Sequence, residues 1–337
     1  MNHADDAATL RHFILGFRRT QLIGVAARLG LADELRDGPR SVEDLARSTG
    51  ADVQALRRVL RALASEGVFA ETAGGDFQTT PLADLLRSDA PESMRALAML
   101  YSEPWLWQAY GALPYSVRTG RAAFEHVHGS PFYGFLKDHP AQAELFQQAM
   151  TAFSAHEVAA IASACDLTGA STLVDIGAGH GTLACALLAR HPRLHGIVFD
   201  LPEVIAGARS ALADAGLLQR CTGIGGDFFE AVPGGGDIYL MKSVLHNWDD
   251  EAASRILRRC AAAMHERARL IVVERVVPPG NGASEAKLFD INMMVTVGGQ
   301  ERTEAEYRSL LHAAGLRLVR TTDTSSPLGL IEATRAQ

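Results

Sequence analysis

The sequence contains few cysteines, and no two of them are close together. Cys165, Cys185, Cys221 and Cys260 are widely separated, and there is no CxxC spacing. This pattern excludes a disulfide-stapled scaffold and a thiolate metal site, and it favours reduced, mostly buried thiols. There is no HExxH motif either, so we expect no bound metal.

Long apolar runs are also missing. The most apolar stretch, LIVVERVV, is interrupted by Glu274 and Arg275, and it is far too short to span a bilayer. The first ten residues, MNHADDAATL, hold two acids, no basic cluster and no apolar core, so we expect no secretory signal. We therefore expect a cytoplasmic protein with no membrane partner.

Positive charge is not in excess. The 337 residues include 32 Lys and Arg against 39 Asp and Glu, which gives a formal net charge of −7. A mildly acidic chain does not attract phosphate backbones or anionic lipid, so nucleic acid is an unfavourable partner. The composition is ordinary for a globular protein, and the length predicts about two domains.

The N-terminal part, residues 1–90, has the pattern of a small helical domain. Apolar residues recur near the helical period over 9–30, and Ser41 begins another helix with Asp44 in place of the usual capping-box Glu or Gln. A further helix and two short strands within 69–80 follow. The order helix, turn, helix, hairpin predicts a winged-helix-like domain.

Residues 91–168 are expected to form a helical connector. Aromatic residues are frequent in this segment: Tyr101, Trp105, Trp107, Tyr110, Phe132, Tyr133 and Phe135. A wall for a flat ligand is one interpretation, and core packing is the better one for any single residue.

From Thr172 onward, strand-like and helical runs alternate. The strand-like runs are TLVDIG, HGIVFD, CTGIGGD, DIYLMKS and RLIVVE, followed by the pair LRLVRTT and LGLIEATR. This alternation predicts an α/β fold with a parallel, doubly wound, Rossmann-like sheet over residues 169–337.

A glycine-rich turn follows the first of these strands, in LVDIGAGHGTLACALLARHP. Its spacing is GxGxG, with Asp175 two residues before Gly177, and Thr182 stands where the dinucleotide fingerprint has its last glycine. Gly177 and Gly179 let the backbone turn sharply and approach a ligand. The pattern suits a cofactor that has an amino group and lacks a pyrophosphate, although a purely structural turn stays open.

Acidic residues follow the next two strands. Asp200 can accept hydrogen bonds from both hydroxyls of a ribose. Asp227 can accept from an adenine amino group, with Phe228 against the ring, or it can cap a turn. Together with Asp175, these acids favour a nucleoside cofactor at the carboxyl edge of the sheet.

Lys242 and His246 follow the fourth strand and are expected at the same edge. A histidine titrates near neutral pH, so His246 can take a proton from a phenol that attacks an electrophilic methyl group, or it can be an ordinary hydrogen-bonded histidine. Glu274 and Glu301 are two possible partners that would orient its ring, and each could instead pair with an arginine such as Arg302.

The motifs LVDIGAGHG, FDLPEVI, GGDFFEAVP, DIYLMKSVLHNWDDEAASRIL, LIVVERVVP and GGQERTEAEYRSLL together resemble the plant-type small-molecule O-methyltransferases, of the caffeate and hydroxyneurosporene kind. Bacterial members act in antibiotic and pigment biosynthesis. The resemblance covers nearly the whole chain. It implies an S-adenosylmethionine-dependent enzyme that methylates a hydroxyl of a small aromatic molecule, and a homodimer formed by the N-terminal domain, with Phe13 and Phe17 as candidate contacts.

The resemblance also implies roles for single residues. His246 is the general base, flanked by Glu274 and Glu301. The cofactor is held by Asp175, Gly177, Gly179, Asp200, Leu201, Asp227, Phe228 and Lys242. The acceptor is contacted by Phe146, Met150, Phe153, Asn292 and Met293.

One departure and three alternatives stand beside this interpretation. The family often has Asp after the catalytic histidine, where this chain has Asn247. A DNA-binding regulator is disfavoured because residues 41–90 hold five basic and eight acidic side chains, a net charge of −3. An NAD-dependent enzyme is disfavoured by Thr182. An N-methyltransferase stays open, since a ring nitrogen with a free lone pair needs no base. The acceptor itself, whether phenol, naphthoate, quinone or phenazine, is not specified.

Overall fold

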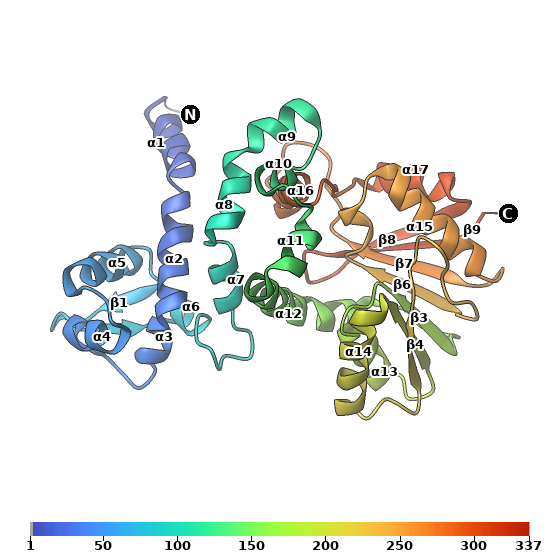
Figure 1. Cartoon of the computed structure of the whole chain (residues 1–337), viewed down its shortest axis with the longest axis horizontal. Coiled ribbons are helices and arrows are strands. Elements are labelled where there is room, and N and C mark those ends of the chain that lie inside the picture. The colour runs from blue at the N-terminus through green and yellow to red at the C-terminus, as the bar shows by residue number, and fades with distance from the viewer. Residues whose placement is uncertain (1–2, 337) are drawn as a thin grey trace. The chain divides into compact units, whose positions relative to one another are not determined.

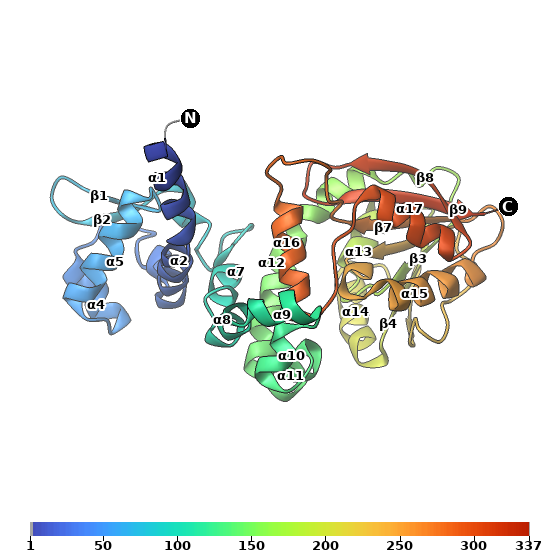
Figure 2. The same ribbon diagram turned by 90° about the horizontal axis from the view of Figure 1, so that it is seen from above.

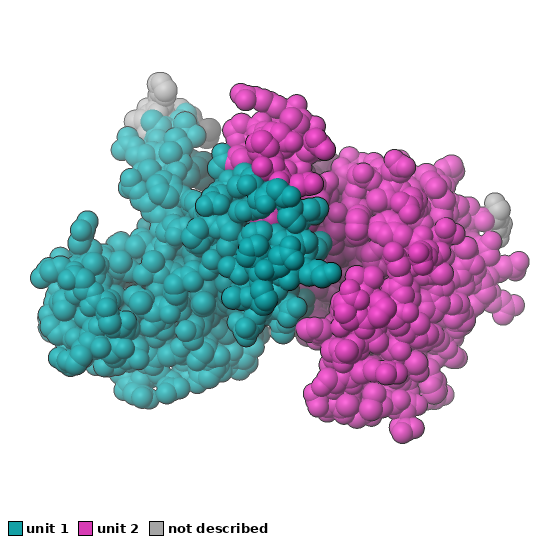
Figure 3. All heavy atoms as spheres, viewed as in Figure 1, with its two compact units in different colours: residues 1–111, 127–155 teal, residues 112–126, 156–337 magenta. Residues whose placement is uncertain are grey.

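The computed structural model describes residues 3–336. The chain separates into two compact units (Figure 3). The first comprises residues 1–111 and 127–155, and the second comprises residues 112–126 and 156–337. The residues expected to form a connector, 91–168, are therefore distributed over both units.

The first unit begins with two helices where the sequence pattern indicated one over residues 9–30 (Figure 1). These are α1 (His3–Ile14) and α2 (Phe17–Leu29). The break falls at Gly16, whose amide donates to Phe13 O at 3.1 Å, three residues back. A glycine inside a helix has no side chain to restrict its backbone, so the continuous helix is easily interrupted there. At the other end, Gly30 closes α2 in the left-handed conformation, with φ of +66°.

The winged-helix-like order is confirmed as a local arrangement. It consists of α3 (Leu31–Glu34), α4 (Val42–Thr49), α5 (Val53–Ser65), β1 (Phe69–Glu71) and β2 (Phe77–Thr79). Ser41 caps α4 by accepting from the Asp44 amide, and β1 pairs with β2 in antiparallel register. Leu45, Leu60 and Phe77 are all completely buried in the core beneath them.

Further helices complete the first unit. They are α6 (Pro81–Asp84), α7 (Arg95–Leu100), α8 (Pro104–Gly111) and α11 (Phe132–Asp138). Helices α10 (Ala123–His128) and α12 (Pro140–Ala164) contribute residues to both units. The Trp105 ring packs 5.6 Å from Phe135 and 6.1 Å from Phe132, and all three are buried. Core packing is thus the role of these aromatics, whereas Tyr133 is half exposed.

The second unit is built on one sheet of seven strands, as the alternation predicted. They are β3 (Thr172–Ile176), β4 (His195–Asp200), β5 (Cys221–Gly225), β6 (Ile238–Lys242), β7 (Arg269–Glu274), β8 (Leu316–Asp323) and β9 (Gly329–Arg335). The spatial order is β5-β4-β3-β6-β7-β9-β8. Strands β3, β4, β5, β6 and β7 are parallel to one another. Strand β9 runs antiparallel to both of its neighbours, β7 and β8.

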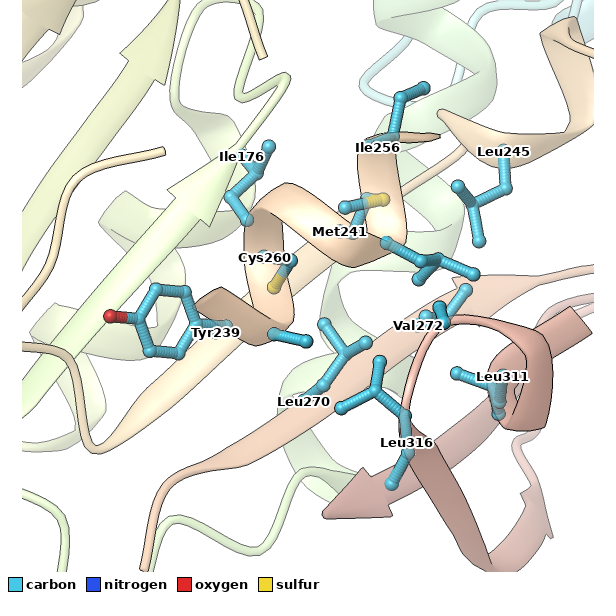
Figure 4. Packing of buried hydrophobic residues seen from close by; sticks show 14 of the residues in the cluster. Ile176, Tyr239, Met241, Leu245, Ile256, Cys260, Leu270, Val272, Leu311 and Leu316 are labelled. Carbon is cyan, nitrogen blue, oxygen red and sulfur yellow. The ribbon is translucent and has the colours of Figure 1, made fainter. Parts of the chain in front are cut away.

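Helices cover both faces of this sheet (Figure 2). They are α13 (Thr182–Arg190), α14 (Pro202–Asp214), α15 (Asp250–Ala263) and α17 (Glu304–Ala313). The second unit also contains α9 (Leu113–Thr119) and α16 (Glu285–Thr296), which contact each other. Alternate residues of one strand serve opposite faces. Tyr239 and Met241 pack with residues of α15 and α17, as Figure 4 shows in close view, while Leu240 packs with residues of α13 and α14. This confirms the doubly wound α/β fold.

The order of the strands locates the site. From β3 the chain moves outward through β4 to β5 and then returns to β6 on the other side of β3. The loops that follow β3 and β6 therefore diverge at the carboxyl edge, and ligands of open α/β sheets bind at such a switch point. The glycine-rich turn follows β3, and His246 follows β6.

The cysteines and the helices agree with the absence of disulfide spacing and of long apolar runs in the sequence. The four cysteines are free, and burial raises the pKa of Cys165 and of Cys221 to about 12, so these thiols stay protonated at neutral pH. Within residues 3–336, no helix has the length and apolar character needed to cross a membrane.

Candidate active site

The glycine-rich turn after β3 requires glycine at each position of its spacing. Gly177, Gly179 and Gly181 have φ of +66°, +56° and +74°, which other residues rarely adopt. A side chain at Gly177 would also meet Val244, since its Cβ would lie 2.6 Å from a Val244 methyl carbon. A Cβ at Gly179 would meet nothing within 4 Å. The backbone at Gly179 therefore borders open space that a ligand can approach.

Asp200 lies beside this turn at the end of β4. Its Oδ2 accepts from the Gly179 amide at 2.8 Å, and its Oδ1 accepts from the Leu201 amide at 2.7 Å. The two hydrogen bonds hold the carboxylate in one orientation at the edge of the sheet. Leu201 is 44% exposed next to it.

Asp175 lies inside the fold, with 2% exposure. Burial, followed by the nearby Asp200 carboxylate, raises its pKa to about 7, while a hydrogen bond from the Ala184 amide in α13 opposes the shift. The carboxyl therefore ties β3 to the first turns of α13 and is only partly ionised at neutral pH. Its direct contact with a cofactor stays a prediction.

Asp227 and Phe228 follow β5. Asp227 is exposed, and its Oδ1 accepts from the Phe229 amide at 2.8 Å. This is the turn-capping role that the sequence left open, and it leaves the second oxygen available for a ligand. The ring of Phe228 packs edge-on against Phe229 and Trp248, at 5.1 and 6.2 Å.

His246 lies at the edge of the sheet, at the end of a strained turn that follows β6. Ser243, directly after β6, has φ of +54°, the one positive φ outside glycine among the described residues. Its amide still donates to Val273 O at 3.0 Å, and the 3₁₀ helix η1 (Leu245–Asn247) begins two residues later. Such strain is often found at functional sites. Nothing in the sequence pattern distinguished Ser243 from an ordinary turn residue.

Two glutamates converge on His246, as the sequence predicted. Glu301 Oε1 lies 2.9 Å from the ring Nδ1 in hydrogen-bond geometry, and Glu274 Oε2 lies 3.2 Å from the same nitrogen. Glu274 Oε1 also accepts from the Val244 and His246 amides, at 3.0 and 3.3 Å. Both carboxyls and the ring are buried. Glu274 thus fixes the backbone of the turn and Glu301 fixes the ring, which leaves Nε2 as the nitrogen that can accept a proton.

The cluster cannot carry its full formal charge. Burial raises the pKa of Glu301 to about 8 and raises that of Glu274, and burial also lowers the pKa of His246. Two carboxylates this close cannot both ionise easily, so at neutral pH we expect a neutral imidazole, one carboxylate and one protonated carboxyl. The three side chains also bring possible ligand atoms within 4.8 Å of one another. A metal-free site stays a prediction.

The segment GGQERT braces the turn from the other side. A Cβ at Gly299 would overlap the carbonyl oxygen of His246, so only glycine permits this approach. The Gln300 amide donates to the same oxygen at 2.9 Å. Arg302, with 1% exposure, donates to Leu245 O and Trp248 O and pairs with Asp250 at 2.9 Å. Pairing of Arg302 with Glu274 or Glu301, the alternative left open by the sequence, is therefore not observed.

Asn247 occupies the position at which the family often has Asp. Its Nδ2 donates to Ser243 O at 3.1 Å and to Val244 O at 3.3 Å. An ionised Asp could not donate to these carbonyls. The amide therefore stabilises the strained turn directly.

Lys242 forms a charged network beside His246 with Glu157 and Arg275, neither of which the sequence indicated as a site residue. Glu157, near the end of α12, lies 3.0 Å from Lys242 Nζ and 3.4 Å from an Arg275 nitrogen. Arg275 also stacks on the Phe289 ring, at 4.0 Å from its centroid. The signal available in the sequence was the charge of Arg275 inside an apolar strand run.

The predicted acceptor contacts belong to different units. Phe146, Met150 and Phe153 lie on the part of α12 in the first unit, and Phe146 packs edge-on against Phe132 at 5.2 Å. Asn292 and Met293 lie on α16 in the second unit, where Met293 is buried. Their role in binding an acceptor stays a prediction.

The residues at the edge of the sheet fit a nucleoside cofactor that carries a positive charge. The open backbone at Gly179 and the carboxylates of Asp200 and Asp227 offer hydrogen-bond acceptors to ribose, amino and adenine donors. On the described loops after β4 and β5, Asp200 and Asp227 supply negative charge that attracts a cationic cofactor. Together with the buried histidine across the switch point, the fold and the site define a methyltransferase of the Rossmann-like, S-adenosylmethionine-dependent class.

Comparison with known proteins places the chain more narrowly. A model of the O-methyltransferase domain matches residues 110–317, and a model of the O-methyltransferase dimerisation domain matches residues 11–89. The chain therefore belongs to this O-methyltransferase family and is an S-adenosylmethionine-dependent enzyme.

Similar proteins cover its whole length. Phenazine O-methyltransferase PhzM of Lysobacter antibioticus is 42% identical over 97% of this chain and 96% of its own. Mitomycin biosynthesis 6-O-methyltransferase of Streptomyces lavendulae is 40% identical over 97% of this chain and 94% of its own. The SAH-bound crystal structure of CalO1, a methyltransferase in calicheamicin biosynthesis, superposes with a TM-score of 0.89 at 35% identity and covers 100% of both chains.

Proposed function

We propose that this enzyme methylates a phenolic hydroxyl of a small, flat aromatic secondary metabolite, with His246 as the general base. The observation that carries the proposal is the buried imidazole whose Nδ1 faces two carboxyls, 2.9 and 3.2 Å away. A histidine that only packs in the core needs no such pair. Burying two carboxyls costs free energy, and a role in holding and stabilising the imidazolium explains why both are present.

The chemistry of the site follows from these contacts. S-adenosylmethionine, when bound, supplies an electrophilic methyl group. Gly179, Asp200 and Asp227 would hold the nucleoside part of this cofactor. His246 Nε2 takes the hydroxyl proton as the oxygen becomes nucleophilic. The ionised carboxylate of the Glu274 and Glu301 pair then stabilises the imidazolium at Nδ1, and both side chains keep the ring oriented. The remaining task of the protein is to align acceptor and methyl group.

The names of related proteins support a phenolic acceptor. They include 3-amino-4-hydroxybenzoate 4-O-methyltransferase of Streptomyces cremeus and 2,7-dihydroxy-5-methyl-1-naphthoate 7-O-methyltransferase of Streptomyces carzinostaticus. These names, with the phenazine and mitomycin enzymes, support phenols, naphthoates, quinones and phenazines as the acceptor classes to test.

Methylation of nitrogen is the second candidate. Phenazine-1-carboxylate N-methyltransferase of Pseudomonas aeruginosa is 31% identical over the whole chain. A ring nitrogen with a free lone pair needs no base, so the retained cluster around His246 favours oxygen.

The N-terminal residues support a homodimer. Leu10, Phe13, Ile14 and Phe17 are 60%, 70%, 64% and 48% exposed, which is costly for apolar side chains in water. They lie within or beside the segment that matches the dimerisation domain. Its net charge of −3 over residues 41–90 makes DNA an unfavourable partner for this domain.

The experiment combines a panel of acceptors with a base variant. The protein is incubated with labelled S-adenosylmethionine and phenols, naphthoates, quinones and phenazines, and products are identified by mass spectrometry. For the hydroxyl acceptor found, His246→Ala should lower kcat by about a hundredfold or more. Its affinity for S-adenosylhomocysteine, measured by calorimetry, should be nearly unchanged, and His312→Ala on the exposed end of α17 serves as the control. An unaffected kcat would favour nitrogen methylation or catalysis by alignment alone.

A further inference from the structure

Glu157 is a buried carboxylate that bridges two strands of the sheet. It is 3% exposed, its Oε2 lies 3.0 Å from Lys242 Nζ, and its Oε1 lies 3.4 Å from Arg275 Nη2. Lys242 is the last residue of β6, and Arg275 directly follows β7. One side chain of α12 thus holds cations from two neighbouring strands at the edge where His246 lies.

Burying such a charged network costs more free energy than filling the same space with apolar side chains. Removing charges from water costs free energy that ion pairs recover only in part, and apolar side chains of similar volume would pack as well. The position of the network suggests a use for it. Lys242 precedes His246 by four residues, and Arg275 is adjacent to Glu274 in the chain.

The network reaches the catalytic base through an aromatic ring. The Arg275 guanidinium lies 4.0 Å from the centroid of the Phe289 ring, a cation–π contact. The Phe289 ring lies 6.2 Å from the imidazole of His246, tilted by 32°. Arg275 therefore contacts the ring that lies beside the base.

Charge gives the network a second effect on His246. Several charged groups surround the imidazole, namely Glu274, Glu301, Arg275, Lys242 and Arg302. Burial lowers the pKa of His246, Glu274 raises it, and the three cations lower it further. Glu157 contacts two of those cations and Asp250 contacts the third. Loss of the Glu157 charge would therefore remove one negative group that lies beside both Lys242 and Arg275.

The place of Glu157 on its helix connects it with acceptor binding. Phe146, Met150, Phe153 and Glu157 follow one another at intervals of four, three and four residues. Residues at this spacing share one face of a helix. Glu157 therefore continues, one turn further, the face on which the acceptor contacts are predicted.

We propose that Glu157 is a positioning residue of the active site, which holds Lys242 and Arg275 in place and offsets their charge, so that Phe289 and the charged form of His246 are both supported. It does not touch the reacting atoms. This inference rests on the proposed role of His246.

The test measures His246 directly and needs no acceptor. The imidazole signals of histidine-labelled protein, saturated with S-adenosylhomocysteine, are followed by NMR against pH, and His246 is assigned by its loss in His246→Ala. In Glu157→Gln the pKa of His246 should fall by about one pH unit. Glu144→Gln, on the exposed surface of the same helix, should leave it unchanged. For the acceptor found in the panel, Glu157→Gln should lower kcat about tenfold.

Further variants separate positioning from a merely structural role. Glu157→Asp keeps the charge and should recover part of kcat, and Glu157→Gln combined with Lys242→Gln should return the pKa of His246 toward its original value. If Glu157→Gln does not fold, kcat and the pKa of His246 are compared between the wild type, Glu157→Asp and the double variant. A lower thermal stability with unchanged His246 titration and kcat would overturn the proposal. If no acceptor is methylated, the proposed function fails, while the titration still decides the role of Glu157.

Discussion

The two halves of the carboxyl edge are built in different ways. After β3, β4 and β5, the acids are held by amides one or two residues away or on the neighbouring loop, as with Asp200 and Gly179 at 2.8 Å. Around His246, the acids Glu274 and Glu301 are buried and meet partners far along the chain, as with Glu301 and His246, 55 residues apart. The first half is a set of exposed loops, and the second is a charged core.

If the proposed roles hold, this difference separates cofactor binding from proton transfer. The loops after β3 to β5 offer fixed acceptors without desolvating them, which suits reversible binding of a charged nucleoside. In the half around His246, the ionisable groups are buried. Burial lowers the pKa of His246 and raises the pKa of Glu274 and Glu301, so the neutral form of each group is favoured. Variants on the first half should therefore change affinity, and variants on the second should change kcat.

Gly299→Ala should give the largest effect. Its Cβ would overlap the carbonyl oxygen of His246 and displace the turn, and a misplacement of about 1 Å costs about a hundredfold in rate. We expect kcat to fall by at least that factor, with the calorimetric affinity for S-adenosylhomocysteine little changed. Gly282→Ala, where a Cβ meets nothing within 4 Å, is the control. Wild-type activity in Gly299→Ala would show that the turn can shift without loss.

The two glutamates should differ in their effect on kcat. Glu274 holds two backbone amides and supports the imidazolium, so Glu274→Gln should lower kcat by about thirtyfold. Glu301, with a pKa of about 8, is mostly protonated at neutral pH, and a neutral amide in Glu301→Gln imitates that state. The loss there should be only a few-fold below pH 8. Steady-state rates of both variants across pH measure the difference, and equal losses would mean that both carboxyls are ionised.

Asp200→Asn tests the cofactor half. The amide keeps the shape of the side chain but loses the charge and one acceptor, so the Kd for S-adenosylhomocysteine should rise about tenfold. The pH dependence of kcat at saturating cofactor should stay as in the wild type. Asp214→Asn, at the far end of α14, is the matched control. A change in the pH profile of Asp200→Asn would mean that the two halves are electrostatically coupled.

The pH dependence of stability tests the protonation of Glu301 separately from catalysis. Glu301 has a folded pKa near 8, above the ordinary value of 4.5 in the unfolded chain, so between these values the folded state binds more protons. The free energy of unfolding of the wild type, relative to Glu301→Gln, should therefore fall as pH rises from 5 to 8, by less than about 1.4 kcal/mol per pH unit. Denaturant titrations at several pH values measure it. A relative stability that rises with pH would show that Glu301 is ionised in the fold.

Much of the fold could be predicted from sequence because its signals are local. The strands of the second unit are apolar runs, and Ser41 and Gly30 mark helix ends through contacts within a few residues. The split of the first helix was missed because the apolar period continues across Gly16. The approach of Glu274 and Glu301 to His246 was expected because His246 and Glu274 lie at strand ends and because the resemblance implies that Glu301 flanks the histidine. Ser243, Gly299 and Glu157 were not, because their importance arises from partners distant in sequence.

The sequence alone determined the order of the strands along the chain, the glycine-rich turn and the acids that follow each strand. These depend on backbone geometry and on hydrogen bonds over short separations. Only the tertiary structure decided which groups lose contact with water together. That is why the pKa values of His246, Glu274 and Glu301, the pairing of Arg302 with Asp250, and the bridge from Glu157 to two strands become apparent only in the folded molecule.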